Sequence, residues 1–331
     1  MKKSLRYYDD VSYEKGNRMK KIGILYGMEH SFPLELAETI NKRKVRGIVA
    51  ESMKIGSIRL DSKIDCDVIL DRVSYEVPYF RSVLKKAAFD AIRVINHPFY
   101  CCAADNFYNL LLAKSMGINV PKTAILPSKE HPEGASSESM KNLIYPLNWE
   151  ETFDYIGFPA YIKPNQGLSG SNAYKVYNHY EFFAAFDFTG SKVMMLQEAI
   201  EYMEFYRVFV IGKKEVRIIS YDPGKPHNYR YSSKPPELSP ELKNILENDG
   251  IKMAEATSFD FNAIDFAIRD GVPYAIELLN PVPRIDKEFM RDEDYSWILE
   301  TSADLLINAA KEKNFTDKTK AEKIKINYWS S

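Results

Sequence analysis

A lysine stands at the end of a short apolar stretch, directly before a loop rich in glycine and serine. Residues 159–176 read PAYIKPNQGLSGSNAYKV, so Lys163 precedes a loop that contains Gln166, Gly167, Ser169, Gly170 and Ser171. Glycine lets a backbone approach an anion closely, the N–H groups of such a loop can hold oxygens, and an ammonium group adds a positive charge. The pattern therefore favours the phosphates of a nucleotide, although it lacks the Gly-Lys-Ser/Thr of a Walker motif. The alternative is a flexible surface loop beside a solvated lysine.

Three oxygen-bearing side chains belong to a predicted hairpin over residues 263–281. Asp265 and Glu277 each stand in an apolar context, AIDFAI and YAIELLNP, and Asn280 follows. A carboxylate is costly to bury unless it is paired or binds a metal ion. Carboxylate and amide oxygens are hard ligands that suit Mg²⁺ carrying a polyphosphate. A magnesium site is therefore one interpretation, and two carboxylates on the solvent side of a half-exposed sheet are the other.

The register of this hairpin determines whether the two carboxylates can meet. A two-residue turn at residues 270–271, with regular pairing beyond it, would place Asp265 opposite Ile276. Asp265 and Glu277 would then lie on opposite faces, because a shift of one residue moves a side chain to the other face. A shared metal ion thus predicts a longer loop or a β-bulge between the turn and Asp265.

A third group of polar residues stands where an apolar segment ends, within residues 196–212, LQEAIEYMEFYRVFVIG. The apolar run meets Gln197 and Glu198, which is typical of a hinge between two lobes. Arg207 then begins an otherwise apolar strand. Its planar guanidinium suits an anionic group, and a surface arginine at the start of a strand is the alternative.

Alternating apolar runs and helical patterns predict a small parallel α/β domain over roughly residues 20–100. Such alternation is typical of parallel sheets. Gly23 and Gly27 flank the first apolar run, but the spacing of a dinucleotide-binding fingerprint is absent. The predicted strands lie in residues 21–27, 46–52 and 66–74, and the predicted helices in residues 33–43 and 78–91.

The remainder of the chain mixes helices with further strands. A helix closed by Gly117 is expected after residue 103, and another is expected to begin after Ser239, a suitable N-cap that Pro240 follows. Other helices are expected in residues 148–157, 180–187 and 296–313. Strands are expected in residues 159–164, 172–178, 192–200, 206–223 (two strands joined at 212–213) and 263–281.

Composition excludes several classes of protein. The 331 residues include 45 Lys and Arg against 46 Asp and Glu, so the net charge of −1 gives no bulk reason to bind nucleic acid or an anionic membrane. No run approaches the ~18 apolar residues of a membrane span, and the N-terminus lacks the apolar core of a signal peptide. Three cysteines without CxxC spacing fit a reducing compartment. We therefore expect a cytoplasmic protein of two or three domains, with no membrane or nucleic-acid partner.

In this order, the three groups of residues resemble the ATP-grasp superfamily. Residues 159–176 match its phosphate-loop strand pair, 196–200 its adenine hinge, 206–216 the strands that follow, and 264–283 its metal hairpin. The resemblance covers roughly residues 22–312 and is strongest to carboxylate–amine ligases, such as glutamate ligases acting on peptide termini and D-alanine–D-alanine ligases. It implies an α/β and α+β protein in which an N-terminal parallel α/β domain precedes two lobes that sandwich the nucleotide.

The resemblance also implies how the chain divides. The expected segments are a polar arm (1–19), the N-terminal domain (20–102), a central lobe (103–196), a C-terminal lobe with the metal hairpin (197–318) and a tail (319–331).

Site roles follow from the same resemblance. Lys163 would hold the α- and β-phosphates, and the loop from Gln166 to Ser171 would close over the outer phosphates. Adenine would lie against the backbone near Gln197 and Ile200, with Glu198 beside it, and Glu204 would serve the ribose hydroxyls. Arg207 and Arg230 would steady phosphate or a substrate carboxylate. Asp265, Glu277 and Asn280 would hold one or two Mg²⁺, with Mn²⁺ as an alternative.

The implied activity is an ATP- and Mg²⁺-dependent ligase that joins a carboxylate to an amine, from small molecules or peptides, through an acyl phosphate. The sequence departs from the family pattern at two places. Asn106 stands where the family has a lysine that touches ATP, and Glu277 and Asn280 are three residues apart rather than two. These departures favour the alternative, an ATP-binding module without ligase turnover in a regulatory or scaffold role. The oligomeric state is not predicted.

Overall fold

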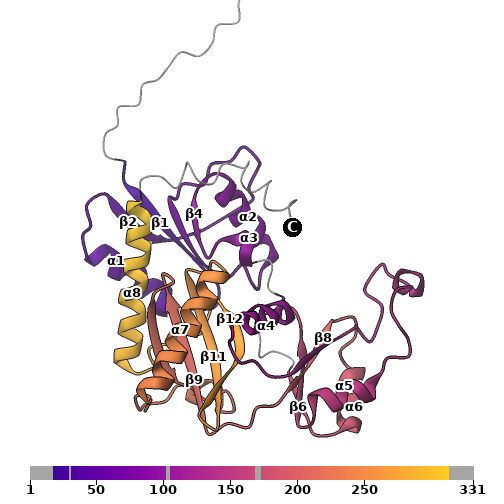
Figure 1. Ribbon diagram of the computed structural model, residues 1–331. Coiled ribbons are helices and arrows are strands. Elements are labelled where there is room, and N and C mark those ends of the chain that lie inside the picture. The colour runs from indigo at the N-terminus through magenta and orange to yellow at the C-terminus, as the bar shows by residue number, and fades with distance from the viewer. Residues whose placement is uncertain (1–17, 30, 102–104, 168–172, 313–331) are drawn as a thin grey trace, which may run out of the picture.

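The computed structural model describes residues 18–29, 31–101, 105–167 and 173–312. Within them lie three four-stranded sheets, one in each of three regions of the chain (Figure 1). The N-terminal sheet lies at the top of that view, with the C-terminal sheet below it and the central sheet to one side. In the same described residues, no helix is both long and apolar enough to cross a membrane.

The N-terminal region forms the predicted parallel α/β layer. Its sheet has the order β2-β1-β3-β4, and all three strand pairs are parallel. Helix α1 packs on one face and α2 on the other, in two separate apolar clusters. The elements are β1 (Lys20–Tyr26), α1 (Ser31–Lys42), β2 (Ile48–Ser52), β3 (Val68–Arg72), α2 (Pro78–Phe89), β4 (Arg93–Ile95) and α3 (Pro98–Cys101).

The central region forms an antiparallel sheet with the order β5-β8-β6-β7. Two helices cover one of its faces through an aromatic cluster around Trp149, Phe153 and Phe182. The strand β5 was not predicted, because it is short and only Leu126 in it is fully buried. The elements are α4 (Asn106–Ser115), β5 (Thr123–Leu126), the 3₁₀ turn η1 (Ser137–Met140), α5 (Trp149–Ile156), β6 (Ala160–Pro164), β7 (Tyr174–Val176), α6 (His179–Asp187) and β8 (Met194–Glu198).

The C-terminal region forms the third sheet, with the order β10-β9-β11-β12, between two long helices. Helix α7 packs on one face, and α8 packs on the other in a cluster that also holds α1. The Ser239 hydroxyl accepts a hydrogen bond from the Leu242 N–H, so the predicted N-cap is confirmed. The elements are β9 (Glu204–Ile211), β10 (Glu215–Ser220), the 3₁₀ turn η2 (His227–Tyr229), α7 (Pro240–Ala256), β11 (Phe261–Arg269), β12 (Val272–Asn280) and α8 (Asp292–Lys311).

The hairpin of β11 and β12 has a two-residue turn followed by irregular pairing. Asp270 and Gly271 both have positive φ, 53° and 76°, as a tight hairpin turn requires. Pairing is regular as far as Phe266 opposite Ala275, and then shifts by one residue so that Asp265 faces Glu277. The predicted β-bulge is therefore present, and it places both carboxylates on the same side of the sheet.

A second shift in the same hairpin brings Asn280 into line. Ala263 pairs with Asn280, although regular pairing from Asp265 would place Leu279 there. The buried Asn262 amide supports this second bulge, since it donates to the Leu278 carbonyl (2.9 Å) and accepts from the Asn280 N–H (2.9 Å). Ala263 and Asp265 share a face of β11, so their partners Asn280 and Glu277 share that face too.

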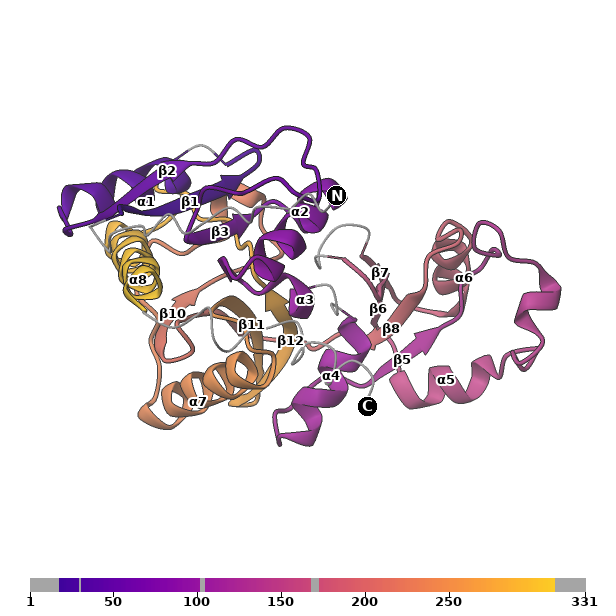
Figure 2. The same ribbon diagram turned by 90° about the horizontal axis from the view of Figure 1, so that it is seen from above.

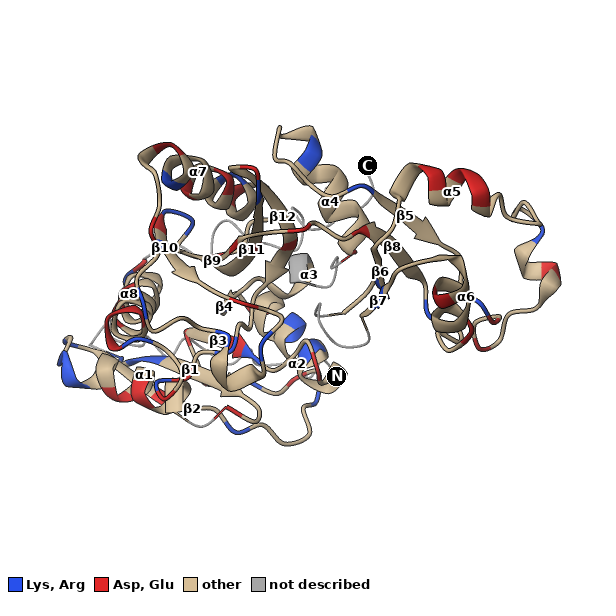
Figure 3. Ribbon diagram, turned by 90° about the horizontal axis from the view of Figure 1, so that it is seen from below, with Lys and Arg blue, Asp and Glu red and all other residues tan. Residues whose placement is uncertain are grey.

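The N-terminal and C-terminal regions share one apolar core. The central sheet has its own, and α4 and β8 of the central region also contribute to a second core of the C-terminal sheet. Seen from above, the central region extends to one side of the other two, with α4 next to β12 (Figure 2). Helices α1, α7 and α8 each carry charges of both signs, whereas the charges on α5 are acidic (Figure 3).

Asn96 joins the N-terminal sheet to the C-terminal one. Its side chain donates to the Phe261 carbonyl (2.6 Å) and accepts from the Phe261 N–H (2.8 Å), and both residues are buried. The Asn96 amide therefore satisfies both the N–H and the carbonyl group of a buried residue in the C-terminal sheet.

We predict that Asn96→Ala lowers the free energy of unfolding by about 3 kcal/mol, because it leaves a buried donor and a buried acceptor unpaired. Urea unfolding followed by circular dichroism measures this change. The exposed Asn228 makes a suitable control, and Asn228→Ala should stay within about 0.5 kcal/mol of the wild type. Equal effects of the two substitutions would contradict the docking role of Asn96.

Candidate functional site

Three charged side chains from three neighbouring strands lie in one row across the C-terminal sheet. Arg207 on β9 pairs with Asp265 on β11, which in turn faces Glu277 on β12. The Arg207 Nε and Nη2 atoms donate to the two carboxylate oxygens of Asp265, at 2.7 and 2.8 Å. Both side chains are more than 90% buried, with exposed fractions of 7% and 8%. The arginine is therefore not the surface residue that one interpretation of the sequence allowed.

Two tyrosines enclose the Arg207 guanidinium. Its Cζ atom lies 3.8 Å from the centre of the Tyr221 ring, and Nη1 donates to the Tyr231 hydroxyl at 3.2 Å. That hydroxyl donates in turn to the Arg284 carbonyl at 2.8 Å. Burial opposes the charge of Arg207, but the Asp265 carboxylate outweighs it, so the pKa of Arg207 is raised. The arginine is thus a fixed cation.

Lys163 reaches this row from the central region. It is 8% exposed, and its Nζ atom donates to the Ile276 carbonyl at 3.4 Å. Ile276 is the extra residue of the first bulge, so its carbonyl lies outside the regular ladder. Burial lowers the pKa of Lys163 to about 8, and the negative charge of Glu277 acts in the opposite direction.

A small cavity of about 10 Å³ separates Lys163 and Glu277 from α4. Asn106 and Asn109 line it, and Asp105 caps the helix by accepting from the Tyr108 N–H. Asn109 is buried, and within the described parts of the chain its Nδ2 atom has no hydrogen-bond partner. The cavity is therefore polar on three sides and about large enough for one water.

The start of the glycine- and serine-rich loop is attached to α4. Gln166 forms a β-bridge with Asp105, and the Asn165 side chain binds both the Asp105 carboxylate (3.0 Å) and the Phe107 N–H (2.9 Å). Gly167 has a φ of 99°, which a residue with a side chain adopts only with strain. Ser169, Gly170 and Ser171 lie outside the described residues, so their predicted contact with phosphates stays a prediction.

The predicted hinge residues lie at the end of β8 and just beyond it. The Gln197 side chain is buried and donates to the Thr123 hydroxyl at 3.0 Å. The Glu198 carboxylate pairs with Arg269 at 2.7 Å, which ties the central sheet to the turn end of the C-terminal hairpin. Ile200 follows and is buried. The predicted contact of this segment with adenine through its backbone stays a prediction.

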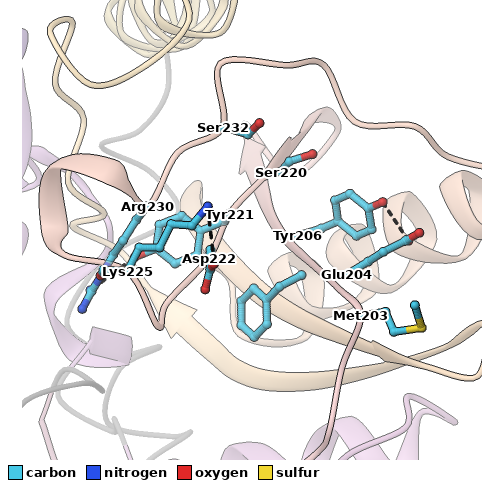
Figure 4. A pocket seen from close by; sticks show the side chains of 10 residues that line it. Met203, Glu204, Tyr206, Ser220, Tyr221, Asp222, Lys225, Arg230 and Ser232 are labelled. Atoms are coloured by element: carbon cyan, nitrogen blue, oxygen red, sulfur yellow. Dashed lines mark hydrogen bonds and ion pairs between the residues drawn. The ribbon is translucent and has the colours of Figure 1, made fainter.

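Glu204 and Arg230 line one cavity of about 240 Å³ at the ends of β9 and β10. Figure 4 shows Arg230 and Lys225 on one side of it and Glu204 on the other. The Tyr206 hydroxyl donates to the Glu204 carboxylate at 2.9 Å, and Arg230 Nε donates to the Lys225 carbonyl at 3.0 Å. Glu204 also borders a larger cavity of about 700 Å³ beside the hinge.

The three predicted metal ligands are not equally suited to bind a cation. Asn280 suits one, because its Oδ1 atom is buried and has no hydrogen-bond partner in the described chain, and the bulges align it with Glu277. Asp265 does not, since Arg207 occupies both of its oxygens. Among the described residues, no group of three His, Cys, Asp or Glu side chains is placed to hold a metal ion.

The fold, in contrast with the sequence, has many relatives of known structure. No protein-family model matches the chain, and no curated protein matches it in sequence. D-alanine–D-alanine ligase of Bacillus anthracis, solved with ATP, is similar over 89% of this chain and 99% of its own, with a TM-score of 0.60 at 17% identity. The VanG D-Ala:D-Ser ligase of Enterococcus faecalis covers 88% and 100%, with a TM-score of 0.62 at 15% identity. The RimK domain protein ATP-grasp of Sphaerobacter thermophilus covers 87% and 99%, with a TM-score of 0.61 at 14% identity.

The chain has the ATP-grasp fold. The expectation drawn from its three groups of residues is therefore confirmed at the level of the fold. The roles of individual residues in this ATP-grasp chain stay predictions, since identities of 13–18% carry no residue-by-residue assignment.

Several polar residues of the site were not predicted from the sequence. Asn262 and Asn109 are buried amides in apolar stretches, FNAIDF and FYNLLL, and that context is a usable signal. The two tyrosines around Arg207 carry no such signal, because a tyrosine in a strand or loop is common.

We predict that Asp265→Ala lowers the free energy of unfolding by about 3–5 kcal/mol, since it leaves the buried Arg207 charge without its partner. The double substitution Arg207→Met/Asp265→Leu should recover most of that loss. Urea unfolding of the wild type, Arg207→Met, Asp265→Leu and this double variant gives the coupling energy.

An exposed pair provides the control for this cycle. Lys42 and Glu38 on α1 are 77% and 65% exposed, so Glu38→Ala should cost less than about 0.5 kcal/mol. A double variant as unstable as Asp265→Ala alone would show that the buried pair is not coupled as described.

Proposed function

We propose that the protein is an ATP-dependent ligase that joins a carboxylate to an amine. The observation that carries the proposal is the contact between Lys163 of the central region and the Ile276 and Glu277 bulge of the C-terminal hairpin. The contact brings Lys163 close to Glu277 at the junction of the central and C-terminal sheets. Asn280, which the bulges align with Glu277, adds an amide oxygen that has no hydrogen-bond partner in the described chain. A polyphosphate with a divalent cation suits that set of charges. The ATP-grasp fold and the ligase names of the similar structures support the same function.

The proposed reaction has two steps. A carboxylate oxygen of the acid attacks the γ-phosphorus of ATP, the bond to the β,γ-bridging oxygen breaks, and ADP leaves. The amine then attacks the carbonyl carbon of the acyl phosphate, and phosphate leaves while the nitrogen loses a proton. Such chemistry needs little covalent participation by the protein, so positioning and electrostatics account for most of the catalysis.

The residues take the following proposed roles. Lys163 holds the α- and β-phosphates, the loop that begins at Gln166 covers the outer phosphates, and Glu204 accepts from the ribose hydroxyls. The backbone near Gln197 and Ile200 contacts adenine. Arg230, which lies across the same cavity from Glu204, receives the substrate carboxylate.

Glu277 and Asn280 are the residues that would hold a Mg²⁺ or Mn²⁺ ion. When bound, such an ion supplies neutralisation of the charge that develops on the phosphate oxygens. Asp265 belongs to this set in the sequence-based prediction, but its pairing with Arg207 speaks against a direct role.

An ATP-binding module without turnover is the second candidate. Asn106 favours it, because this position lines the Lys163 cavity and provides no charge for a phosphate. The paired state of Asp265 favours it as well. Release of ADP in the presence of a carboxylate and an amine separates the two candidates, since only a ligase needs both substrates.

We predict that ATP with Mg²⁺ raises the melting temperature, in line with about 2.7 kcal/mol of added stability at one hundred times the Kd. Lys163→Gln should remove most of this shift, whereas Lys192→Gln, at an exposed position of the same region, should keep it. No shift at millimolar ATP in the wild type would contradict nucleotide binding.

Binding at pH 8.5 adds a check that is specific to Lys163. With a pKa of about 8, roughly three quarters of Lys163 is neutral at this pH in the free protein. Phosphate raises the pKa of a neighbouring ammonium, so binding should take up most of one proton. Calorimetry in buffers of different ionisation enthalpy measures the uptake, and Lys163→Gln should abolish it.

A panel of carboxylates and amines should reveal ADP release that requires both substrates. In Arg230→Lys, we predict that the KM for the acid rises about tenfold while ATP affinity is unchanged, because the charge stays but the bidentate contact is lost. Arg59→Lys, on the exposed surface of the N-terminal region, is the control. An unchanged KM in Arg230→Lys would assign the acid to another residue.

A further inference from the structure

We infer that the guanidinium of Arg207 takes the place of a divalent cation at Asp265, so that the nucleotide is bound with one metal ion, on Glu277 and Asn280, and not with two. This inference rests on the proposed nucleotide function. It concerns how the chain distributes positive charge along its acidic hairpin.

The first argument is that Arg207 engages both oxygens of the Asp265 carboxylate. Its two oxygens accept from Nε and Nη2 of Arg207 at 2.7 and 2.8 Å, in the bidentate geometry that a guanidinium forms best. A metal ion that used the remaining lone pairs of this carboxylate would come within a few ångströms of a buried cation that has no other carboxylate partner among the described residues.

The second argument is that Arg207 cannot readily turn away. Tyr221 stacks on its guanidinium at 3.8 Å, and Tyr231 accepts from Nη1 and is itself anchored to the Arg284 carbonyl. The arginine is therefore held by two tyrosines from the segment after β10 and by Asp265 of β11. Rotation would place its charge among apolar residues of the shared core, such as Phe205 and Phe209, which lie on the same face of β9.

The third argument is the balance of charge along the row. Arg207 and Lys163 carry two positive charges, and Asp265 and Glu277 carry two negative charges. When a nucleotide draws Lys163 to its phosphates, the positive charge of Lys163 moves away from Glu277, whereas Arg207 stays with Asp265. One divalent ion on Glu277 supplies positive charge in place of Lys163, and a second ion beside Asp265 would meet a carboxylate that is already neutralised.

The remaining ligands suit a single ion. The second bulge aligns Asn280 with Glu277, and Asn280 Oδ1 is buried without a hydrogen-bond partner in the described chain. Two protein oxygens leave most positions of an octahedral ion to phosphate oxygens and water, as is usual for Mg²⁺ in nucleotide sites.

Mn²⁺ binding in the presence of a non-hydrolysable ATP analogue tests the inference. Electron paramagnetic resonance counts the ions bound per protein relative to the analogue alone, and dipolar broadening reports two ions close together. The wild type should bind one Mn²⁺ without broadening. Arg207→Gln frees Asp265 and should bind two, and Arg207→Gln/Asp265→Asn should return to one. Glu277→Gln should lose the ion of the wild type.

Asp265→Asn in the otherwise unchanged protein keeps the test decisive if Arg207→Gln does not fold. Asparagine still accepts a hydrogen bond from Arg207, so Mn²⁺ affinity should stay within about twofold of the wild type. Two Mn²⁺ ions in the wild type, or a tenfold loss of affinity in Asp265→Asn, would overturn the inference and leave the nucleotide site intact. Absence of analogue binding in the wild type would instead contradict the proposed function.

Discussion

The need to balance four charges, three of them buried and that of Glu277 half-buried, constrains the whole site. Lys163 comes from the central region, and Arg207, Asp265 and Glu277 come from three adjacent strands of the C-terminal sheet. Each charge would be costly alone in an apolar setting, but together they sum to zero. Regular pairing beyond the turn would send Glu277 to the opposite face. The first β-bulge is thus what allows Lys163 to be buried at the junction.

The same arrangement explains which parts of the molecule are joined firmly. The N-terminal region and the C-terminal sheet share one apolar core, in which Phe32 of α1 packs edge-on against Tyr295 of α8, and Asn96 adds two buried hydrogen bonds. The central sheet has its own core, but α4 and Met195 of β8 also pack into an apolar cluster with the C-terminal sheet. Polar contacts such as Glu198 with Arg269 complete this junction. Polar contacts exchange with water and ligands more easily than apolar ones do, so we expect adjustment around a ligand at the polar part of the junction.

Much of the fold was predictable because its signals are local. Alternation of strands and helices gave the N-terminal domain, and the Ser239 cap and the turn at residues 270–271 are set by their own residue types. The first bulge was predicted only on the condition that Asp265 and Glu277 share a metal ion. The pairing of Arg207 with Asp265 was not predictable, because it depends on the register of strands that are 58 residues apart. The second bulge depends likewise on Asn262, whose amide replaces ladder bonds that no local pattern reveals.

Fewer basic side chains are available to bind an anion than the sequence suggests. Asn106 contributes none, and Arg207 is already neutralised by Asp265, so Lys163 and Arg230 are the basic side chains of the predicted set that keep charge for a ligand. Burial lowers the pKa of Lys163 to about 8, and the negative charge of Glu277 acts in the opposite direction. An anion that enters would therefore both attract this lysine and stabilise its protonated form. In the empty site the charges of Glu277 and Asp265 offset those of Lys163 and Arg207, so the row stays neutral until an anion and its metal ion arrive.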